Sequence, residues 1–560
     1  MMINFKRKKN RNVEIDPDEI FIDSHNLPQF DNQQFEGRLE KPISKLSLFI
    51  VFSFFFLILI VFTFKIWNLQ IVNGESYNQK SENNRLRHTP VFAVRGVIYD
   101  RNGVEIAWNE PSDDPDFFSR RYSTSTGLAH TVGYVQYPSK DGAGFYYKED
   151  FEGIDGIEKY FNSDLKGSNG VKLVEVNALG KVQSDNIIQP AKEGKSINLS
   201  IDSRVQSEMY RAIKDIANRV GFTGGAGMIM DIKTGEVIAI TSYPEFDPEI
   251  MSSKSDTAKV KSYLTSTGKP FLNRAVDGLY TPGSIVKPYM ALAALNEDII
   301  DPSRKILSTG SISVQNQYFP DLQTTFKDWK AHGLVDMRRA IAVSSDIYFY
   351  EVGGGYKELK GLGINRIEKY MRMFGFGEKI ENSFFTGGSG TVPNPEWKKA
   401  NFKGEAWNLG NTYHTSIGQY GFQVSVVQIT RAVASLVNNG LLRDPSIIKG
   451  EEGKILRQID IPKEYFTIVK EGMRLGVTEG TGSSLKLPFV DVASKSGTAE
   501  LGVTKDNVNS WMTGFFPYKN PRYAFAVIME KGSAHNLIGA GSAMREVFEW
   551  MNINTPEYFK

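Results

Sequence analysis

The sequence predicts a membrane-anchored α+β protein whose largest domain is an antiparallel sheet covered by helices. Residues 46–64 form a run of 19 residues without a charge. Strand-like segments at 227–231 and 236–241 come before several helical segments, and more strand-like segments follow residue 490. Helices between an early strand pair and a late strand group favour a layered α+β domain, with its first and last strands in one antiparallel sheet.

The N-terminal part predicts a tail and one membrane anchor. Residues 1–45 are polar and aperiodic, so we expect a mostly disordered tail. Residues 46–64 are long enough to cross an apolar bilayer core of about 30 Å. The run is too long for a signal-peptide core, and no small-residue cleavage site follows it, which predicts an uncleaved anchor. Basic residues gather on its N-terminal side, which predicts a cytoplasmic N-terminus and an extracytoplasmic remainder.

Composition narrows the function classes. The chain has 560 residues, of which 41% are hydrophobic and 23% charged, so most of it can bury a core. A net charge of +2 gives no reason to expect a nucleic-acid partner. Because there is no cysteine, disulfides, thiolate metal sites and a cysteine nucleophile are excluded. We expect a tail (1–45), a transmembrane helix (46–64), a membrane-proximal pedestal (65–197) and a catalytic domain (198–560).

The pedestal is predicted to be elongated and mixed in structure. Residues 65–90 read as a helix that continues out of the membrane. Two short strands within 95–107 flank an Asn-Gly pair, which is a strong hairpin signal. Further strands are expected at 130–134, 171–176 and 196–201.

The catalytic domain shows sharper periodicity. Residues 233–235 read Lys-Thr-Gly, and we assign them to the turn between its first two strands. The helix expected at 424–438 should end near Gly440, a favourable residue just after a helix. We expect helices at 204–220, 284–295, 337–350 and 424–438, and late strands at 490–494, 512–516 and 523–529.

Ser284 is the predicted nucleophile. It follows Pro282-Gly283 and opens an apolar helix, and Lys287 stands one turn further on the same face. A neutral amine there can remove the serine proton, so Lys287 is the candidate general base. The helix N-terminus also favours developing negative charge. The same Ser-x-x-Lys spacing occurs in less suitable contexts at Ser163, Ser266, Ser446 and Ser483.

Ser344 and Asp346 form the second candidate element. They interrupt an otherwise apolar helical segment, where a helix cap is the alternative explanation. In the catalytic interpretation Ser344 relays a proton and Asp346 makes a hydrogen bond to Lys287.

The third element is Lys495-Ser496-Gly497-Thr498, in a strand-like context. Gly497 would let a substrate backbone approach closely. The N–H of Thr498 is expected to form an oxyanion hole with that of Ser284, worth about 3–4 kcal/mol per donor.

A lysine base must be neutral to act. Holding Lys287 neutral at pH 7 costs roughly 4–5 kcal/mol from its usual pKa of about 10.4. Burial and a second positive charge both lower a lysine pKa. We therefore expect Lys495 to lie close to Lys287 and to supply that charge.

These elements, in this order, resemble the class B penicillin-binding proteins, the membrane-anchored D,D-transpeptidases of the bacterial cell wall. The resemblance covers most of residues 66–550 and is carried by several further segments. These segments are residues 95–103, 230–236, 242–244, 273–280, 416–419 with Gln428, and 511–515.

The resemblance implies a penicillin-binding/β-lactamase-like transpeptidase domain and a reaction on peptidoglycan stem peptides. Ser284 would attack the carbonyl between two terminal D-alanines, and an amine of a second stem would resolve the acyl-enzyme. Lys495, Ser496 and Thr498 would hold the substrate carboxylate. β-Lactams would trap Ser284, and no cofactor is needed.

The subtype favoured by the resemblance is elongation, with division as the alternative. Implied partners are a polytopic glycan polymerase and rod-shape scaffold proteins, at the bacterial cytoplasmic membrane. Only about twenty residues separate Ala107 from residue 130, so the head subdomain of such relatives is reduced. Some relatives hold zinc through Asp, His and Cys; here Asp328 and His332 are present but Ser345 replaces the cysteine, so we expect no metal.

Rivals of another class stay open. A β-lactam sensor or β-lactamase-like hydrolase would need a base for its water, and Glu396 and Glu405 are the candidates in a loop region. A catalytically inactive scaffold is disfavoured because the serine and lysine residues are all present.

Overall fold

The computed structural model describes residues 44–78, 86–112, 114, 116–142, 146–176, 182–315, 319, 321–381 and 383–560. The chain divides into two compact units, Met1–Leu86 and Arg87–Lys560. The predicted disordered tail lies almost entirely outside the described residues. The predicted boundary between pedestal and catalytic domain stays a prediction, because residues 87–197 of the pedestal lie in the same unit as the catalytic domain.

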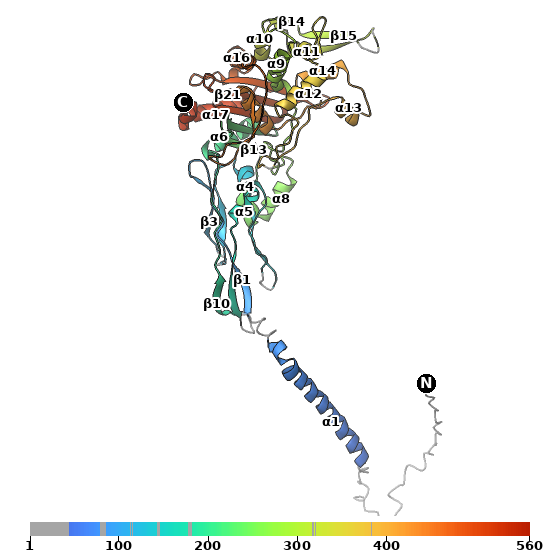
Figure 1. The fold of residues 1–560 in the computed structure, drawn as a ribbon, viewed down its shortest axis with the longest axis vertical. Helices are drawn as coiled ribbons and strands as arrows, with labels where there is room; N and C mark the ends of the chain where they lie inside the picture. The colour runs from blue at the N-terminus through green and yellow to red at the C-terminus, as the bar shows by residue number, and fades with distance from the viewer. Residues whose placement is uncertain are drawn as a thin grey trace, which may run out of the picture. The chain divides into compact units, whose positions relative to one another are not determined.

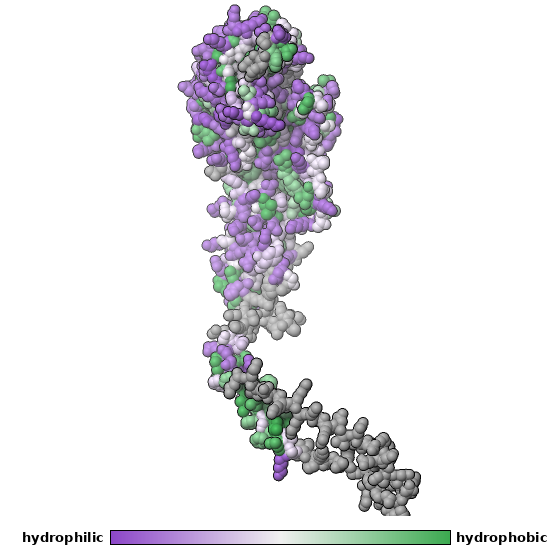
Figure 2. All heavy atoms as spheres, turned by 90° about the vertical axis from the view of Figure 1, so that its right-hand side faces the viewer, coloured by the Kyte–Doolittle hydropathy of each residue, from purple (hydrophilic) through white to green (hydrophobic). Residues whose placement is uncertain are grey.

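The first unit is built on one apolar helix, α1 (Lys45–Trp67), followed by a π-helical turn, η3 (Asn68–Val72). Ser44 begins the helix by accepting a hydrogen bond from the N–H of Ser47. None of its residues is buried, and hydrophobic residues predominate on the part of its surface that Figure 2 shows. It is the one described helix long and apolar enough to cross a membrane. The anchor predicted at 46–64 coincides with it, and its orientation stays a prediction.

The first part of the second unit contains two small sheets. A four-stranded sheet has the order β11-β2-β3-β4, and a three-stranded sheet has the order β1-β9-β10. The predicted hairpin is confirmed, because β2 (Ile98–Tyr99) and β3 (Glu105–Pro111) pair antiparallel. The other strands of these sheets are β1 (Leu86–Val91), β4 (Phe118–Tyr122), β9 (Gly170–Val176), β10 (Val182–Gln189) and β11 (Ile197–Asn198).

The strand predicted at 130–134 is wrong. These residues contain a short helix, α3 (Ala129–Val132). The Glu245 carboxylate accepts hydrogen bonds from the N–H groups of Gly127 and Ala129, which occupies two donors at the start of this helix. Short elements complete this part of the unit: β5 (Val135–Gln136), β6 (Ser139–Lys140), β7 (Tyr146–Lys148), β8 (Glu152–Gly153), α4 (Gly156–Tyr160) and α5 (Asn162–Leu165).

A five-stranded antiparallel sheet organises the catalytic part, in the order β13-β12-β22-β21-β20. The early strand β12 pairs directly with the late strand β22, so the prediction of one shared sheet is confirmed. The strands are β12 (Gly224–Asp231), β13 (Val237–Tyr243), β20 (Ala493–Leu501), β21 (Asn507–Phe516) and β22 (Tyr523–Ser533).

Both faces of the sheet are buried by helices (Figure 1). Along β22, Phe525 and Val527 belong to one apolar cluster, and Ala526 to the other, because successive strand residues point to opposite faces. Helices α6 (Ser203–Val220) and α17 (Ala540–Asn554) cover the first face. Helix α15 (Val426–Val437) covers the second, beneath the helices that carry the candidate catalytic residues.

Two helices differ from the prediction in ways that matter for the site. The helix expected at 284–295 begins with a 3₁₀ turn, η4 (Gly283–Val286), before α9 (Lys287–Asn296). The helix expected at 337–350 is two helices, α10 (Met337–Val343) and α11 (Asp346–Gly354). It breaks because Ser344 adopts a left-handed conformation, with φ of 60°, and Ser345 caps α11.

The remaining elements surround this core. The helices are α7 (Pro248–Ser253), α8 (Thr257–Thr265), α12 (Ile364–Met373), α13 (Pro395–Asn401), α14 (Leu409–Ser416), α16 (Lys463–Glu479), η5 (Ser483–Leu485) and η6 (Pro556–Phe559). Three two-stranded sheets pair β14 (Ile306–Ser308) with β17 (Gly333–Val335), β15 (Ser311–Gln315) with β16 (Gln323–Lys327), and β18 (Leu441–Arg443) with β19 (Ile455–Gln458).

Candidate active site

Ser284 lies in a tight turn held against neighbouring backbone. Gly283 has a φ of 59°, which favours glycine, and its N–H donates to the carbonyl of Gly418 over 3.0 Å. A Cβ on Gly283 would lie 2.8 Å from the carbonyl oxygen of Thr498. Ser284 is half-buried, and its Oγ has no hydrogen-bond partner among the described residues. The hydroxyl is therefore left free to react.

The edge strand β20 runs beside this turn. A Cβ on Gly497 would meet the carbonyl oxygen of Pro282 at 2.9 Å, so the glycine is required by the turn of Ser284 itself. The indole N–H of Trp511, on the neighbouring strand, donates to the carbonyl of Thr281 over 3.0 Å. Thr498 is exposed. The predicted third element thus lies directly beside the predicted nucleophile.

Lys287 is fully buried at the start of α9, and its ammonium points toward the break between α10 and α11. It donates to Asp346 Oδ1 over 2.6 Å, to the Ser344 carbonyl over 2.8 Å and to Ser344 Oγ over 3.3 Å. The hydrogen bond predicted between Asp346 and Lys287 is present in this geometry. Asp346 is therefore positioned to stabilise a protonated Lys287.

Lys495 approaches Ser344 from the opposite side. Its Nζ donates to Ser344 Oγ over 2.9 Å and to the carbonyl of Ser496 over 2.7 Å. Ser344 Oγ thus lies within hydrogen-bond distance of both lysines, as a proton relay requires. Burial, and then the charge of Lys287, hold the pKa of Lys495 well below its usual range.

The structure brings the two lysines together through Ser344 and pairs the carboxylate with Lys287. Lys495 was expected to supply the positive charge that neutralises Lys287. In the structure the carboxylate lies beside Lys287, at 2.6 Å, and the lowered pKa is that of Lys495. The two lysines are as close as expected, because Ser344 Oγ lies within hydrogen-bond distance of both, and the role of each in proton transfer stays a prediction.

Two further residues contact the site and carried no catalytic prediction. Thr481 Oγ1 accepts a hydrogen bond from Ser496 Oγ over 2.6 Å, and it follows α16 in a glycine-rich loop with no recognisable pattern. Asp328 accepts a hydrogen bond from Ser345 Oγ over 2.9 Å, between Ser344 and Asp346. Sequence spacing gave no signal for either contact, because both join segments far apart in the chain.

The residues weighed as metal ligands do not form a set that suits zinc. His332 Nε2 lies 3.5 Å from Asp328 Oδ1, but the third position is the Ser345 hydroxyl, which donates to the same carboxylate. Zinc sites use Cys, His or carboxylate ligands, usually at least three from the protein. Within the described part of the chain, no group of three or more such side chains could hold a metal. The absence of a metal stays a prediction.

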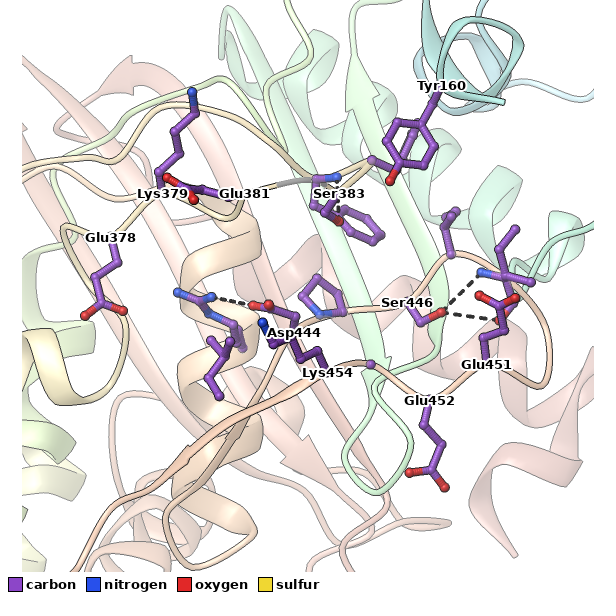
Figure 3. A pocket seen from close by; sticks show the side chains of 18 of the residues that line it. Tyr160, Glu378, Lys379, Glu381, Ser383, Asp444, Ser446, Glu451, Glu452 and Lys454 are labelled. Atoms are coloured by element: carbon purple, nitrogen blue, oxygen red, sulfur yellow. Dashed lines mark hydrogen bonds and ion pairs between the residues drawn. The ribbon is translucent and has the colours of Figure 1, made fainter. Parts of the chain in front are cut away.

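A cavity lies in another part of the second unit, away from the predicted catalytic residues. A cavity of about 610 Å³ opens between the segment around residues 378–385 and the segment 444–457 (Figure 3). Its lining is mixed in charge and includes the ion pair between Arg431 and Asp444. None of the predicted catalytic residues lines it. The candidate site is therefore the region along β20, and its predicted residue roles stay predictions.

Comparison with protein families decides the class. Residues 225–549 match the family described as the penicillin binding protein transpeptidase domain, and residues 116–199 match the penicillin-binding protein dimerisation domain. The chain belongs to the class B penicillin-binding proteins. Ser284, Lys287, Ser344 and Lys495 all lie within the matched transpeptidase region.

Relatives extend the similarity along nearly the whole chain. The peptidoglycan D,D-transpeptidase MrdA of Haemophilus influenzae is 27% identical, covering 90% of each chain. MrdA of Escherichia coli K12 is 26% identical, covering 86% of this chain and 90% of its own. The structure resembles Pseudomonas aeruginosa PBP2 in complex with WCK 5153, with a TM-score of 0.67 and 29% identity over 83% of this chain and 98% of the other. Helicobacter pylori PBP2 in complex with MreC shares the fold, with a TM-score of 0.68 and 24% identity over 84% of this chain and all of the other.

Proposed function

We propose that this protein is an elongation-type peptidoglycan D,D-transpeptidase that acts through a Ser284 acyl-enzyme. The observation that carries the proposal is the juxtaposition of a free serine hydroxyl, two buried lysines joined by Ser344 Oγ, and an open strand edge. The similarity to MrdA transpeptidases along about 90% of the chain supports both the reaction and the elongation subtype.

The first step prepares the base. The substrate carboxylate binds against Lys495, Ser496 and Thr498, and its negative charge raises the pKa of Lys495. Lys495 then takes a proton from Lys287 through Ser344 Oγ. Lys287 becomes neutral. The free-energy cost of a proton on Lys495, which the free enzyme avoids, is offset by the negative charge of the bound substrate.

The second step forms the acyl-enzyme. Lys287 removes the proton from Ser284 Oγ, which attacks the carbonyl carbon between the two terminal D-alanines. The N–H groups of Ser284 and Thr498 stabilise the oxyanion. The C–N bond breaks, the leaving D-alanine takes up the proton, and an ester to Ser284 remains.

The third step forms the cross-link. An amine of a second stem peptide attacks the ester, passes a proton back to the base and releases Ser284. A β-lactam enters the same path as a mimic of the D-Ala-D-Ala end, and its ring-opened ester stays on Ser284. For partners we propose a polytopic glycan polymerase and a rod-shape scaffold protein at the bacterial cytoplasmic membrane.

Intact-protein mass spectrometry after incubation with penicillin tests the proposal. The full chain in detergent is expected to gain one penicillin mass, and Ser284→Ala is expected to gain none. Ser266→Ala is the matched control, because Ser266 has the same Ser-x-x-Lys spacing in an exposed loop and should leave the adduct unchanged. Penicillin consumed without an adduct would indicate a hydrolase. If no adduct forms and no penicillin is consumed, the proposal is contradicted.

A further inference from the structure

Ser344 is held in a backbone conformation that is unfavourable for its residue type. Its φ of 60° and ψ of 39° lie in the left-handed region, between the end of α10 and the start of α11. Such a conformation costs about 1–3 kcal/mol for a residue with a Cβ, and persists only where surrounding contacts determine it. The side chain that bridges the two lysines therefore depends on contacts to its neighbours.

Asp328 supplies two of these contacts on the C-terminal side. Its Oδ2 accepts hydrogen bonds from Ser345 Oγ over 2.9 Å and from the N–H of Ile347 over 3.1 Å. The second bond occupies a free donor at the start of α11. Ser345 and Ile347 stand on either side of Asp346, the carboxylate that pairs with Lys287.

Trp329 supplies a contact on the N-terminal side. Its indole N–H donates to the carbonyl of Val343 over 3.3 Å, and Val343 immediately precedes Ser344. Two consecutive residues, Asp328 and Trp329, thus hold the chain before and after Ser344. We call this pair the Ser344 clamp.

The clamp is itself fixed in place. The N–H of Asp328 donates to the Gly310 carbonyl over 2.9 Å, and Ser308 Oγ donates to its Oδ2 over 3.2 Å. The Asp328 side chain is fully buried, so these bonds form away from water. The hydroxyl of Tyr350, on α11, donates to the carbonyl of Lys327. The clamp and α11 therefore form one connected unit.

We propose that Asp328 is a positioning residue for the transpeptidase reaction, which holds Ser344 and Asp346 at the distances that proton transfer between Lys287 and Lys495 requires. The inference rests on the proposed function, because it concerns the same site. Asp328 does not touch the substrate or the reacting atoms; it acts through the backbone of residues 343–347. A misplacement of about 1 Å by a residue remote from the chemistry can reduce a rate about 10²-fold.

The acylation kinetics of the full chain in detergent test this assignment. A fluorescent penicillin gives the rate constant at saturation and the concentration for half-saturation. Asp328→Ala is expected to lower the rate constant about 100-fold with little change in half-saturation, because the strand edge that binds the ligand is untouched. Asp328→Asn keeps one acceptor oxygen and should lose less. Ser345→Ala removes one donor, and its effect should not add to that of Asp328→Ala, since both break one contact network.

Asp336→Ala separates positioning from stability, because it removes a helix cap outside the clamp. Asp336 caps the other end of α10 by accepting from the N–H of Arg339 over 2.9 Å, and its side chain forms no hydrogen bond with residues 343–347, all of which the structure describes. This control substitution should lower the melting temperature about as much as Asp328→Ala does. It should leave the acylation rate constant of the folded protein unchanged. Wild-type acylation rates in both Asp328 variants, or losses no larger than in Asp336→Ala, would overturn the inference alone. A wild type that penicillin does not acylate would overturn the proposed function as well.

Discussion

Two buried clusters in this protein contain the same kinds of charge, two basic side chains and one carboxylate, yet they behave differently. The pedestal cluster joins two arginines to one glutamate, and the catalytic cluster joins two lysines to one aspartate. The members are Arg95, Arg120 and Glu158 in the first, and Lys287, Lys495 and Asp346 in the second.

In the pedestal cluster both basic side chains contact the same carboxylate. Glu158 is fully buried and accepts from Arg95 Nε over 2.5 Å and from Arg120 Nε over 2.7 Å. Burial raises the pKa of Glu158, but Arg120 and Arg95 more than offset it, so the pKa is lowered. A guanidinium keeps its proton in proteins, so this cluster has one protonation state near neutral pH.

In the catalytic cluster the carboxylate makes a hydrogen bond to only one of the two lysines. Asp346 lies beside Lys287, while Lys495 contacts only neutral oxygens and is buried near the Lys287 charge. An ammonium can lose its proton where a guanidinium cannot. The comparison teaches that the choice of lysine over arginine turns a buried ionic cluster from a structural element into one that can exchange protons.

The largest expected effect comes from removing that difference. Lys495→Arg should keep the positive charge but cannot serve as a neutral proton acceptor, so penicillin acylation should fall about 10²- to 10⁴-fold. Arg120→Lys is the matched exchange in the pedestal and should leave the acylation rate of the folded protein unchanged. Stopped-flow acylation measures both. A Lys495→Arg enzyme within about threefold of the wild type would show that Lys495 acts only as a fixed charge.

The next effect concerns stability. Glu158→Gln leaves two buried arginines without a carboxylate and should lower the free energy of unfolding by about 3–5 kcal/mol at pH 7. Because the pKa of Glu158 is lowered in the folded state, its contribution is present above its unfolded pKa of about 4.3 and is lost as the pH falls further. Denaturant unfolding at pH 7 and pH 3 measures this. An equal difference at both values would mean that the Glu158→Gln substitution disturbs packing and not charge.

Much of the fold could be predicted from the sequence, because the deciding patterns are local. The periodicity of β12 and β22 and the order of elements were enough to predict a shared antiparallel sheet. The uncharged run of residues in α1 was likewise enough to predict a membrane-crossing helix. The strand expected at 130–134 failed because the Glu245 carboxylate, over a hundred residues away, caps the helix that forms there.

The site was predictable in its members but less so in its electrostatics. Motif spacing brought Ser284, Lys287, Ser344 and Lys495 into consideration. Hydrogen bonds join the last three, and the turn of Ser284 lies beside β20. Which lysine is paired depends on the break at Ser344, where left-handed backbone turns Asp346 toward Lys287. That break is held by Asp328 and Trp329, whose contacts are long-range and leave no periodic trace in the sequence.

The smallest expected effect is a change in the pH dependence of stability. The pKa of Lys495 is lowered in the folded protein, so between its folded value and its unfolded value of about 10.4 the unfolded chain binds one more proton. Stability therefore rises with pH across this window, by about 1.4 kcal/mol per unit for one proton. Relative to Lys495→Met, which cannot titrate, the wild type should gain stability in denaturant unfolding as the pH rises toward the unfolded pKa of about 10.4, by at most that amount per pH unit. Lys287→Met should remove part of this gain, because the charge that helps to hold Lys495 neutral is gone. A difference between wild type and Lys495→Met that is constant with pH would mean that Lys495 keeps its proton in the free enzyme, and that the two buried clusters are alike after all.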